Sequence, residues 1–353
     1  DVNIVQNDHL RIASLGFNDL WAAAWSGHAG PLGRPLAMLS FALNHYTGDG
    51  FDAFQFKVVN LLIHLCNALL VAALAHLLFR SLGQPSASKA QAGDVECWAG
   101  WMVAALWGLH PLNLTSVLYV VQRMTSLSAL FGFGALLVYA WYRTRTAQRN
   151  ASEHPLVLGL GAVFVVVACL ALSALSKETG LLFVPLLLWI EFCAYRFQFN
   201  GKSIRLFGIA LDRIVLWMLA LAAVYVVVFQ LPYMLAPGAF ANRDFTLIER
   251  GLTQTRVLFF YLRVFLLPSI SDLSLYHDDF PISHSLLDPP ATAMAVSGLV
   301  FITTAAFLLR KRAPAVLFAW GWFLISHALE STVFPLEMVH EHRNYFATFG
   351  LLL

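Results

Sequence analysis

The sequence predicts an all-α protein that crosses a membrane several times. Hydrophobic residues make up 59% of the 353 positions and charged residues only 12%. A soluble domain usually has about 25% charged residues, so water-facing side chains are scarce here. The apolar residues gather in runs of about 20, the length of a helix that spans a bilayer. These repeated runs predict one polytopic helix bundle.

Apolar windows mark the expected membrane helices, and a further one begins near residue 345. The windows cover residues 57–79, 98–119, 125–142, 156–175, 179–195, 214–231, 290–309 and 313–334. Segment 255–270 is short, contains Arg263 and includes Pro268. If it crossed, the basic stretch 310–312 would lie outside, against the positive-inside rule. We therefore expect this segment to be re-entrant or interfacial.

Residues 1–56 differ from the rest because polar residues, glycine and proline separate short amphipathic pieces. We expect them to form a long first extracytoplasmic loop with interfacial helices, followed by a multi-pass membrane domain over 57–353. One helical face of "RPLAMLSFALNHY" suits either a membrane surface or packing on the bundle. Its apolar residues are Leu36, Met38, Leu39 and Leu43.

Charge and cysteine spacing exclude several classes of protein. The net charge of +2 is too small to indicate nucleic-acid binding. The cysteines have no paired spacing, which argues against a disulfide scaffold or a zinc ribbon. They are Cys66, Cys97, Cys169 and Cys193. The chain begins at Asp1 and stops within an apolar run, so we expect a fragment whose first helix and C-terminal part are missing.

The positive-inside rule places the polar motifs on one outer face. Arginine and lysine gather in loops near 80–89, 143–149, 196–213 and 310–312, which we assign to the cytoplasm. The opposite face then has cations, carboxylates and histidines together. They are Arg34, Arg123, Lys177, Arg343, Asp1, Glu178, Glu341, His110 and His342.

Each motif also has a plainer explanation. Lys177 and Glu178 separate two apolar runs, where a helix turn needs polar residues and a lysine can snorkel to the interface. His110 precedes a proline and suits a helix kink. The histidines of "HEH" at 340–342 are two residues apart, whereas two metal-binding histidines on one helix face are four apart. We expect no metal site there.

Together, however, the motifs favour chemistry on a lipid-linked phosphate. Guanidinium and ammonium groups bind phosphate oxygens. A carboxylate nearby can remove the proton of an incoming hydroxyl, and membrane helices can hold a lipid tail. The outer face therefore predicts transfer of a group from a lipid-linked phosphate to an acceptor.

Five short motifs point to a family. They are "GRPLAMLSFALNHYTG", "VVNLLIHLCNALLV", "HPLNLTSVLYVVQR", "LSKETG" and "HEHRNY". In this order and spacing the chain resembles the transmembrane and tetratricopeptide-repeat O-mannosyltransferases and their bacterial relatives, which are GT-C glycosyltransferases. The resemblance implies a GT-C-type helix bundle and an inverting enzyme. The donor would be a sugar on polyprenyl or dolichyl phosphate, and the acceptor a protein hydroxyl.

The resemblance also implies roles for single residues. "DVNIVQND" resembles the end of a stretch with an Asp-Asp pair, so Asp1 is the candidate catalytic base. Arg34, Arg123 and Lys177 would neutralise the donor phosphate, and Glu178, His342 and Arg343 would shape the pocket. The substrate-binding candidates on this face are completed by His110 and Glu341.

Cofactor, partner and location follow from the same resemblance. No cofactor is expected, and no metal is obligatory because phosphate is a good leaving group. The partners would be the lipid-linked donor, a protein or glycan acceptor and the bilayer. The protein would lie in the bacterial inner membrane, or in the endoplasmic reticulum of a eukaryote, with its active site facing periplasm or lumen.

Two alternatives stay open. A GT-C enzyme that modifies a lipid or polysaccharide would share the many helices and the outer-face arginines. A transporter would instead place its charges near the bilayer midplane on broken helices, whereas here they lie at helix ends on one side.

Overall fold

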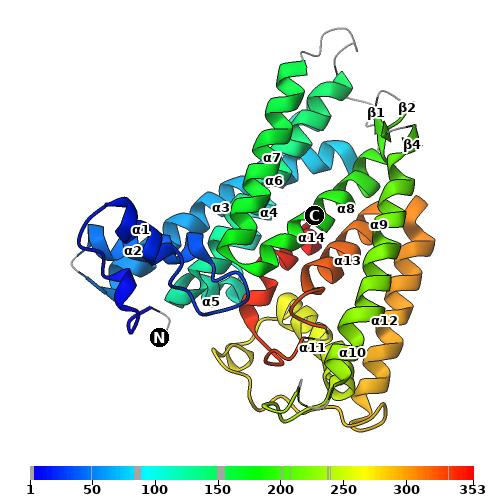
Figure 1. Cartoon of the computed structure of the whole chain (residues 1–353). Helices are drawn as coiled ribbons and strands as arrows, with labels where there is room; N and C mark the ends of the chain where they lie inside the picture. Colours follow the sequence, from blue (N-terminus) through cyan, green and yellow to red (C-terminus); the bar gives the residue numbers. More distant parts are fainter. Residues whose placement is uncertain are drawn as a thin grey trace. The chain divides into compact units, whose positions relative to one another are not determined.

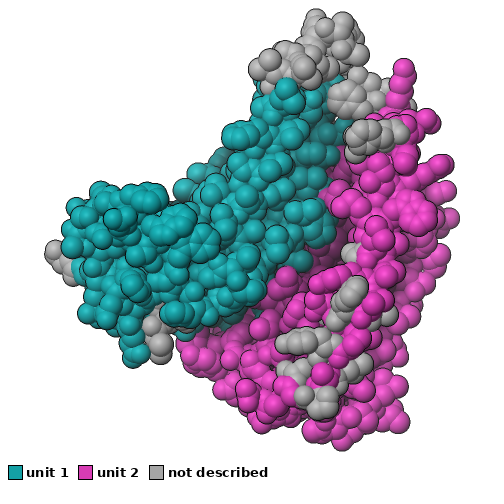
Figure 2. Space-filling view, in the orientation of Figure 1, with its two compact units in different colours: residues 1–187, 341–353 teal, residues 188–340 magenta. Residues whose placement is uncertain are grey.

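The computed structural model describes an almost entirely helical chain (Figure 1). The described residues are 4–48, 50–82, 89–148, 156–199, 202–206, 208–236, 238, 240–332 and 334–353. Within them, strands are confined to two short hairpins. The predicted all-α, polytopic helix bundle is thus confirmed. The chain divides into two compact units, residues 1–187 with 341–353, and residues 188–340 (Figure 2).

The first unit is a bundle in which α6 packs along α3 and α7, and α3 packs along α4. Its α-helices are α1 (Phe17–Ala24), α2 (Pro35–Thr47), α3 (Ala53–Leu82), α4 (Lys89–Gly108), α5 (Leu114–Leu118), α6 (Arg123–Gln148), α7 (Leu156–Ser176), α8 (Phe183–Ile190, which runs into the second unit) and α14 (Ala347–Leu352). Its 3₁₀ turns are η1 (Asp8–Leu10), η2 (Pro111–Asn113), η3 (Val120–Gln122), η5 (Glu178–Leu182) and η10 (Glu341–Asn344).

Five helical stretches of the described residues are long and apolar enough to cross a membrane. They are Ala53–Leu82, Val120–Thr146, Leu158–Ser176, Glu178–Tyr195 and Ala291–Lys311. These match the segments predicted from residues 57, 125, 156, 179 and 290 onward. Within its most apolar window, the second stretch is 61% buried and the third only 11%. The helix α6 is therefore central, whereas α7 faces outward like a lipid-facing helix.

The single helix predicted over 98–119 is wrong in extent. The helix α4 ends at Gly108, and η2 and α5 follow as separate pieces. Pro111 has no N–H to donate and disfavours helical backbone at the residue before it. Accordingly, His110 is extended, with φ −69° and ψ 129°. Its ring then caps the new turn, because Nδ1 accepts a hydrogen bond of 3.2 Å from the N–H of Leu112.

The second unit combines helices with two small hairpins. Its helical segments are η6 (Glu191–Tyr195), α9 (Leu211–Tyr225), η7 (Val226–Gln230), α10 (Leu231–Leu235), α11 (Leu247–Leu266), η8 (Ile270–Asp272), α12 (Ala291–Leu308), η9 (Leu309–Lys311) and α13 (Pro314–His327). The antiparallel hairpins pair β1 (Gln198–Phe199) with β2 (Lys202–Ser203), and β3 (Arg205–Leu206) with β4 (Ile209–Ala210). The segments α9, η7 and α10 follow one another without a gap, and cover the window predicted at 214–231.

The helix α11 begins with a capping box in which Thr246 and Glu249 bond each other's backbone N–H. The other carboxylate oxygen of Glu249 meets Nδ1 of His284 at 2.6 Å. This hydrogen bond lowers the pKa of Glu249 and raises the pKa of His284. Charges make α11 too polar to stand among the five membrane-length stretches. That segment 255–270 does not cross remains a prediction.

A row of α11 side chains holds the loop after α13. The guanidinium of Arg250 donates to the carbonyls of Glu330, Thr332 and Leu336. Gln254 donates to the carbonyl of Met338 at 2.8 Å, and the hydroxyl of Tyr261 bonds the backbone of His340. One of these carbonyls, that of Glu330, is one that a helix continued to 334 would use. The helix α13 ends at His327, short of the predicted limit at 334.

Two glycines on α6 provide a matched test of packing in the first unit. A β-carbon at Gly132 would overlap the ring of Phe183, whereas a β-carbon at Gly134 would meet nothing within 4 Å. Overpacking a core costs about 1–3 kcal/mol, and alanine is favoured over glycine in a helix by roughly 1 kcal/mol. We expect Gly132→Ala to lower the thermal unfolding temperature in detergent, and Gly134→Ala to leave it unchanged or raise it. Equal effects would contradict this packing.

Candidate functional site

The first loop folds back on the membrane helices through its own apolar core. Residues of η1, α1 and α2 pack there against the start of α3 and the region where η3 meets α6. The buried members are Ile4, Leu10, Ile12, Ala23, Ala37, Met38, Phe41, Ala42, Phe56, Val121 and Met124. The loop is therefore a built part of the first unit, and its polar groups have fixed positions.

The helix α2 packs on this core with one face. Ala37, Met38 and Phe41 are buried, while Leu43 is exposed. Of the predicted apolar face, only Met38 is buried, while Leu36 and Leu39 are half-buried, so the packed face of α2 differs from the predicted one. The core thereby fixes the residue that precedes α2, which is Arg34.

A glycine-rich loop, residues 26–34, joins α1 to α2. A β-carbon at Gly27 would overlap the carbonyl oxygen of Gly33, so the two ends of the loop touch. Gly30 has φ +74° and lies against the carboxylate of Glu178, where a β-carbon would overlap an oxygen. Only a glycine suits both the backbone and the space at that point. The loop therefore closes over Glu178.

Arg34 has a left-handed backbone with φ +53° and ψ +51° directly before Pro35. A residue other than glycine pays about 1–3 kcal/mol for such a conformation, which persists only where its surroundings enforce it. The enforcing contact is with Glu178. Nε and Nη2 of Arg34 both reach Oε2 of that carboxylate at 2.9 Å.

In this ion pair, each side chain keeps one polar atom whose hydrogen bonding among the described residues is weak or absent. Oε1 of Glu178 is buried and has no hydrogen-bond partner in the described part of the chain. Nη1 of Arg34 lies 2.6 Å from the sulfur of Met124, and a thioether is a weak acceptor. The pair is thus held in place while retaining hydrogen-bonding capacity on each side.

Lys177 stands next to Glu178 at the turn between two membrane-length helices. The helix α7 ends at Ser176, Lys177 is extended with φ −160°, and η5 begins at Glu178. The interpretation of this pair as a helix turn is confirmed. Nζ of Lys177 is buried and donates to the hydroxyl of Thr125 at 3.2 Å, which donates to Oε1 of Gln122 at 2.7 Å. The turn therefore also brings a buried cation beside the Arg34–Glu178 pair.

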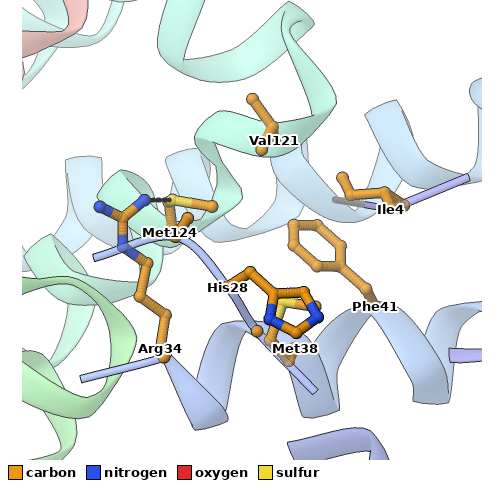
Figure 3. A pocket seen from close by; sticks show the side chains of 10 residues that line it. Ile4, His28, Arg34, Met38, Phe41, Val121 and Met124 are labelled. Carbon is orange, nitrogen blue, oxygen red and sulfur yellow. Dashed lines mark hydrogen bonds between the residues drawn. The ribbon is translucent and has the colours of Figure 1, made fainter. Parts of the chain in front are cut away.

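A small, mostly apolar cavity lies beside Arg34 (Figure 3). It is lined by Ile4, Gly27, His28, Ala29, Gly33, Arg34, Met38, Phe41, Val121 and Met124. Arg34 and Met124 meet at its edge, and His28 lies on the α2 side with Met38. The cavity has room for about one water molecule. This cavity is too small to hold a sugar.

Arg123 is fully buried and is surrounded by protein acceptors. Nε donates to Oδ1 of Asn60 at 2.7 Å, and Nη2 donates to Oδ1 of Asn44 at 2.6 Å. Further donors reach the carbonyls of Ser40 and Phe56. The rings of Phe41 and Phe56 lie 4.8 and 5.0 Å from the guanidinium carbon, a cation–π distance. This geometry gives Arg123 the task of tying α2 and α3 to the start of α6.

A second group of candidates gathers where η10 packs against η2 and α5. Glu341 and Arg343 are buried, and His342 is half-buried. His110 caps the turn on the η2 side. The structure thus brings His110 and the Glu341–Arg343 motif, far apart in the sequence, into neighbouring turns.

A polar network that the sequence reasoning missed supports this second group. Nε2 of His64 lies 2.9 Å from the carbonyl of Gly108, which can only accept, so Nε2 carries the proton. The hydroxyl of Tyr345 then donates to Nδ1 of His64 at 2.8 Å and accepts from Asn67 at 3.1 Å. Trp107 donates to the carbonyl of Tyr345. The network fixes the chain directly after Arg343.

The signal for this network was present in the sequence. Asn60, His64 and Asn67 are spaced i, i+4, i+7 on an apolar helix, so they share one face. Asp1, the predicted base, lies outside the described residues. Among the described residues, no group of three or more His, Cys, Asp or Glu is arranged to hold a metal ion.

Comparison with curated proteins adds a family resemblance to this geometry. The chain is similar to the TMTC protein O-mannosyl-transferases. It is 28% identical to protein O-mannosyl-transferase TMTC4 of Mus musculus over 183 residues, which is 50% of the chain and 24% of that protein. It is 32% identical to Tmtc2 of Drosophila melanogaster over 166 residues, or 46% of the chain and 15% of that protein.

A longer match has lower identity. Protein O-mannosyl-transferase TMTC2 of Homo sapiens is 27% identical over 259 residues, 70% of the chain and 27% of that protein. The matched regions therefore span about a quarter or less of these relatives. No family model matches the chain, and no solved structure matches it. The similarity confirms the resemblance drawn from the short motifs, and with the five apolar helices it identifies a multi-pass membrane protein.

The four hydrogen-bond acceptors around Arg123 lead to a prediction that distinguishes a structural role of this residue from a substrate-binding role. Arg123→Lys keeps the charge but has too few donors, in the wrong geometry, for the four acceptors. Each hydrogen bond to a charged group contributes about 1.5–3 kcal/mol. We expect a lower unfolding temperature and a lower yield of folded protein, measured by size-exclusion chromatography and thermal unfolding in detergent.

The matched control is Arg34→Lys, which changes a half-buried arginine that does not contact these four acceptors. This variant should leave the yield of folded protein near that of the wild type. An Arg123→Lys protein that folds normally but no longer binds a phosphate-bearing lipid would contradict the structural role and support phosphate binding by Arg123.

Proposed function

We propose that the chain is the membrane part of a glycosyltransferase that moves a sugar from a polyprenyl-phosphate-linked donor to a hydroxyl of a protein. The observation that carries the proposal is the meeting of Arg34 with Glu178, 144 positions away, beside the buried Lys177. Two cations thereby stand at the end of a membrane-length helix, where a lipid phosphate enters. The curated relatives named protein O-mannosyl-transferases support the same reading.

In the proposed reaction, the acceptor oxygen attacks the anomeric carbon of the donor. The bond from that carbon to the phosphate oxygen breaks, and a single displacement inverts the configuration. Arg34 and Lys177 offset the negative charge that develops on the leaving lipid phosphate, the electrostatic effect that often contributes most to catalysis. Asp1 is the proposed base that takes the acceptor proton. The second group, with His110, Glu341, His342 and Arg343, is proposed to contact the substrate.

Arg34→Ala and Lys177→Ala should each reduce turnover strongly. Removal of one preorganised donor to a developing anion typically costs about a hundredfold or more in rate. The assay uses the full-length protein in detergent with a labelled polyprenyl-phosphate mannose, and follows sugar transfer to a serine- and threonine-containing peptide. Arg11→Ala is a matched control, because Arg11 is an exposed first-loop arginine that contacts Asp8, the carbonyl of Val5 and the ring of Phe51.

The outcomes separate the candidate functions. Full activity in both variants would reject the phosphate-binding role. Transfer to a lipid or glycan instead of the peptide would favour a GT-C enzyme that modifies a lipid or polysaccharide. No transfer from any lipid donor would favour a transporter. In the same assay, loss of transfer in Asp1→Asn would support that residue as base, whereas retained transfer would point to an aspartate upstream.

The proposed orientation places the Lys177 turn outside the cytoplasm. We expect a reporter fused after Ser176 to read external and one fused after Arg149, in the basic loop, to read cytoplasmic. The measurement is the paired activity of alkaline phosphatase and green fluorescent protein fusions. The reverse pattern would place the Arg34–Glu178 pair on the cytoplasmic side and would reject an extracytoplasmic active site.

A further inference from the structure

The helix α1 carries an uncovered ridge of aromatic side chains. Phe17, Trp21 and Trp25 are 75%, 57% and 54% exposed. They follow at i, i+4 and i+8, so they lie along one side of the helix. The rings contact in sequence, with centroids 5.8 Å apart for the first pair and 5.7 Å for the second. They form one continuous apolar surface.

The rest of α1 is used for packing. Ala23 is fully buried in the first-loop core, and Leu20 packs against that core. Asp19, on the side away from Trp21, accepts a hydrogen bond from Ser14. Asp19 and Ala23 are four residues apart and share one side of the helix. The helix therefore has an aromatic side and a packed side, on which Asp19 is half-buried. By contrast, Trp107 of the same unit is a core residue and is fully buried.

The position of α1 in the chain indicates what covers the ridge. The helix packs on α2, and α2 contacts α3, a membrane-length helix that begins at Ala53. The lipid-facing surface of α3 starts in its first turn, where Phe54 is 72% exposed, and continues with Leu61, Leu62, Leu65 and Leu69. The ridge thus belongs to the segment directly before the membrane entry of the chain.

The chemistry of these aromatic side chains indicates the depth at which the ridge would lie in a bilayer. Tryptophan concentrates at the level of the lipid headgroups, where its apolar body is buried and its N–H meets water. Phe17, Trp21 and Trp25 supply such a surface, and the opposite side of the same short helix packs on the first-loop core. We propose that α1 lies in the headgroup region of the bilayer with this ridge inserted, and anchors the first loop to the membrane. The α2 face expected to lie on a membrane surface or on the bundle has Met38 buried, Leu36 and Leu39 half-buried and Leu43 exposed.

The test scans α1 with an environment-sensitive fluorophore. Single cysteines replace Trp21 and, separately, Phe17 in a full-length protein whose native cysteines are changed to serine, and each is labelled with NBD after reconstitution in phosphatidylcholine–phosphatidylglycerol nanodiscs. We expect blue-shifted emission, quenching by lipids spin-labelled near the headgroup, and protection from aqueous iodide. Asp8→Cys, at an exposed position of η1 in the same loop, is the matched control and should be quenched by iodide.

The other outcomes overturn the proposal. Quenching by iodide at positions 17 and 21 would show a ridge free in water. Protection from both iodide and lipid spin labels would show a protein surface, such as a second copy of the chain, in place of lipid. The second labelled position keeps the test valid if the Trp21 variant fails to fold, and the readout does not depend on catalytic activity.

Discussion

The arrangement of the first unit depends on a buried guanidinium that is held by uncharged acceptors. Arg123 is surrounded by two amide oxygens, two backbone carbonyls and two phenyl rings. Removing a charge from water is expensive unless its hydrogen bonds are replaced. The acceptors come from α2 and α3, so the charge is stable only when these helices and the start of α6 are assembled together. The position of α2, and with it Arg34, follows from this requirement.

The second unit uses the same principle for a different purpose. Arg250 is fully buried and satisfies its donors with backbone carbonyls of the loop after α13. That loop leads directly to His340 and the Glu341–Arg343 motif. In the first unit a buried arginine ties helices together, whereas in the second it binds irregular backbone that regular hydrogen bonding leaves open. Charged residues in this apolar chain are therefore used for architecture as well as for chemistry.

The sequence predicted the features that depend on local pattern. Apolar runs located the five membrane-length stretches, and the Lys177–Glu178 pair located the turn between two of them. It could not predict the role of Arg123, because its acceptors lie 63 and 79 positions away and sequence reveals only the charge. The end of α4 was predictable in principle, since Pro111 breaks a helix locally, but the continuous hydrophobicity across 98–119 concealed it.

The glycine-rich loop over Glu178 has a consequence for sequence variation. Surface loops usually accept insertions because their extra length extends into solvent. Here the ends of the loop touch at Gly27 and Gly33, and its middle rests on a carboxylate at Gly30. The loop is a closed ring of fixed contour length. An exposed side chain such as that of Leu32 is free to vary, whereas an added or deleted residue would open the ring and displace Arg34. In this loop, residue number is constrained more tightly than residue identity.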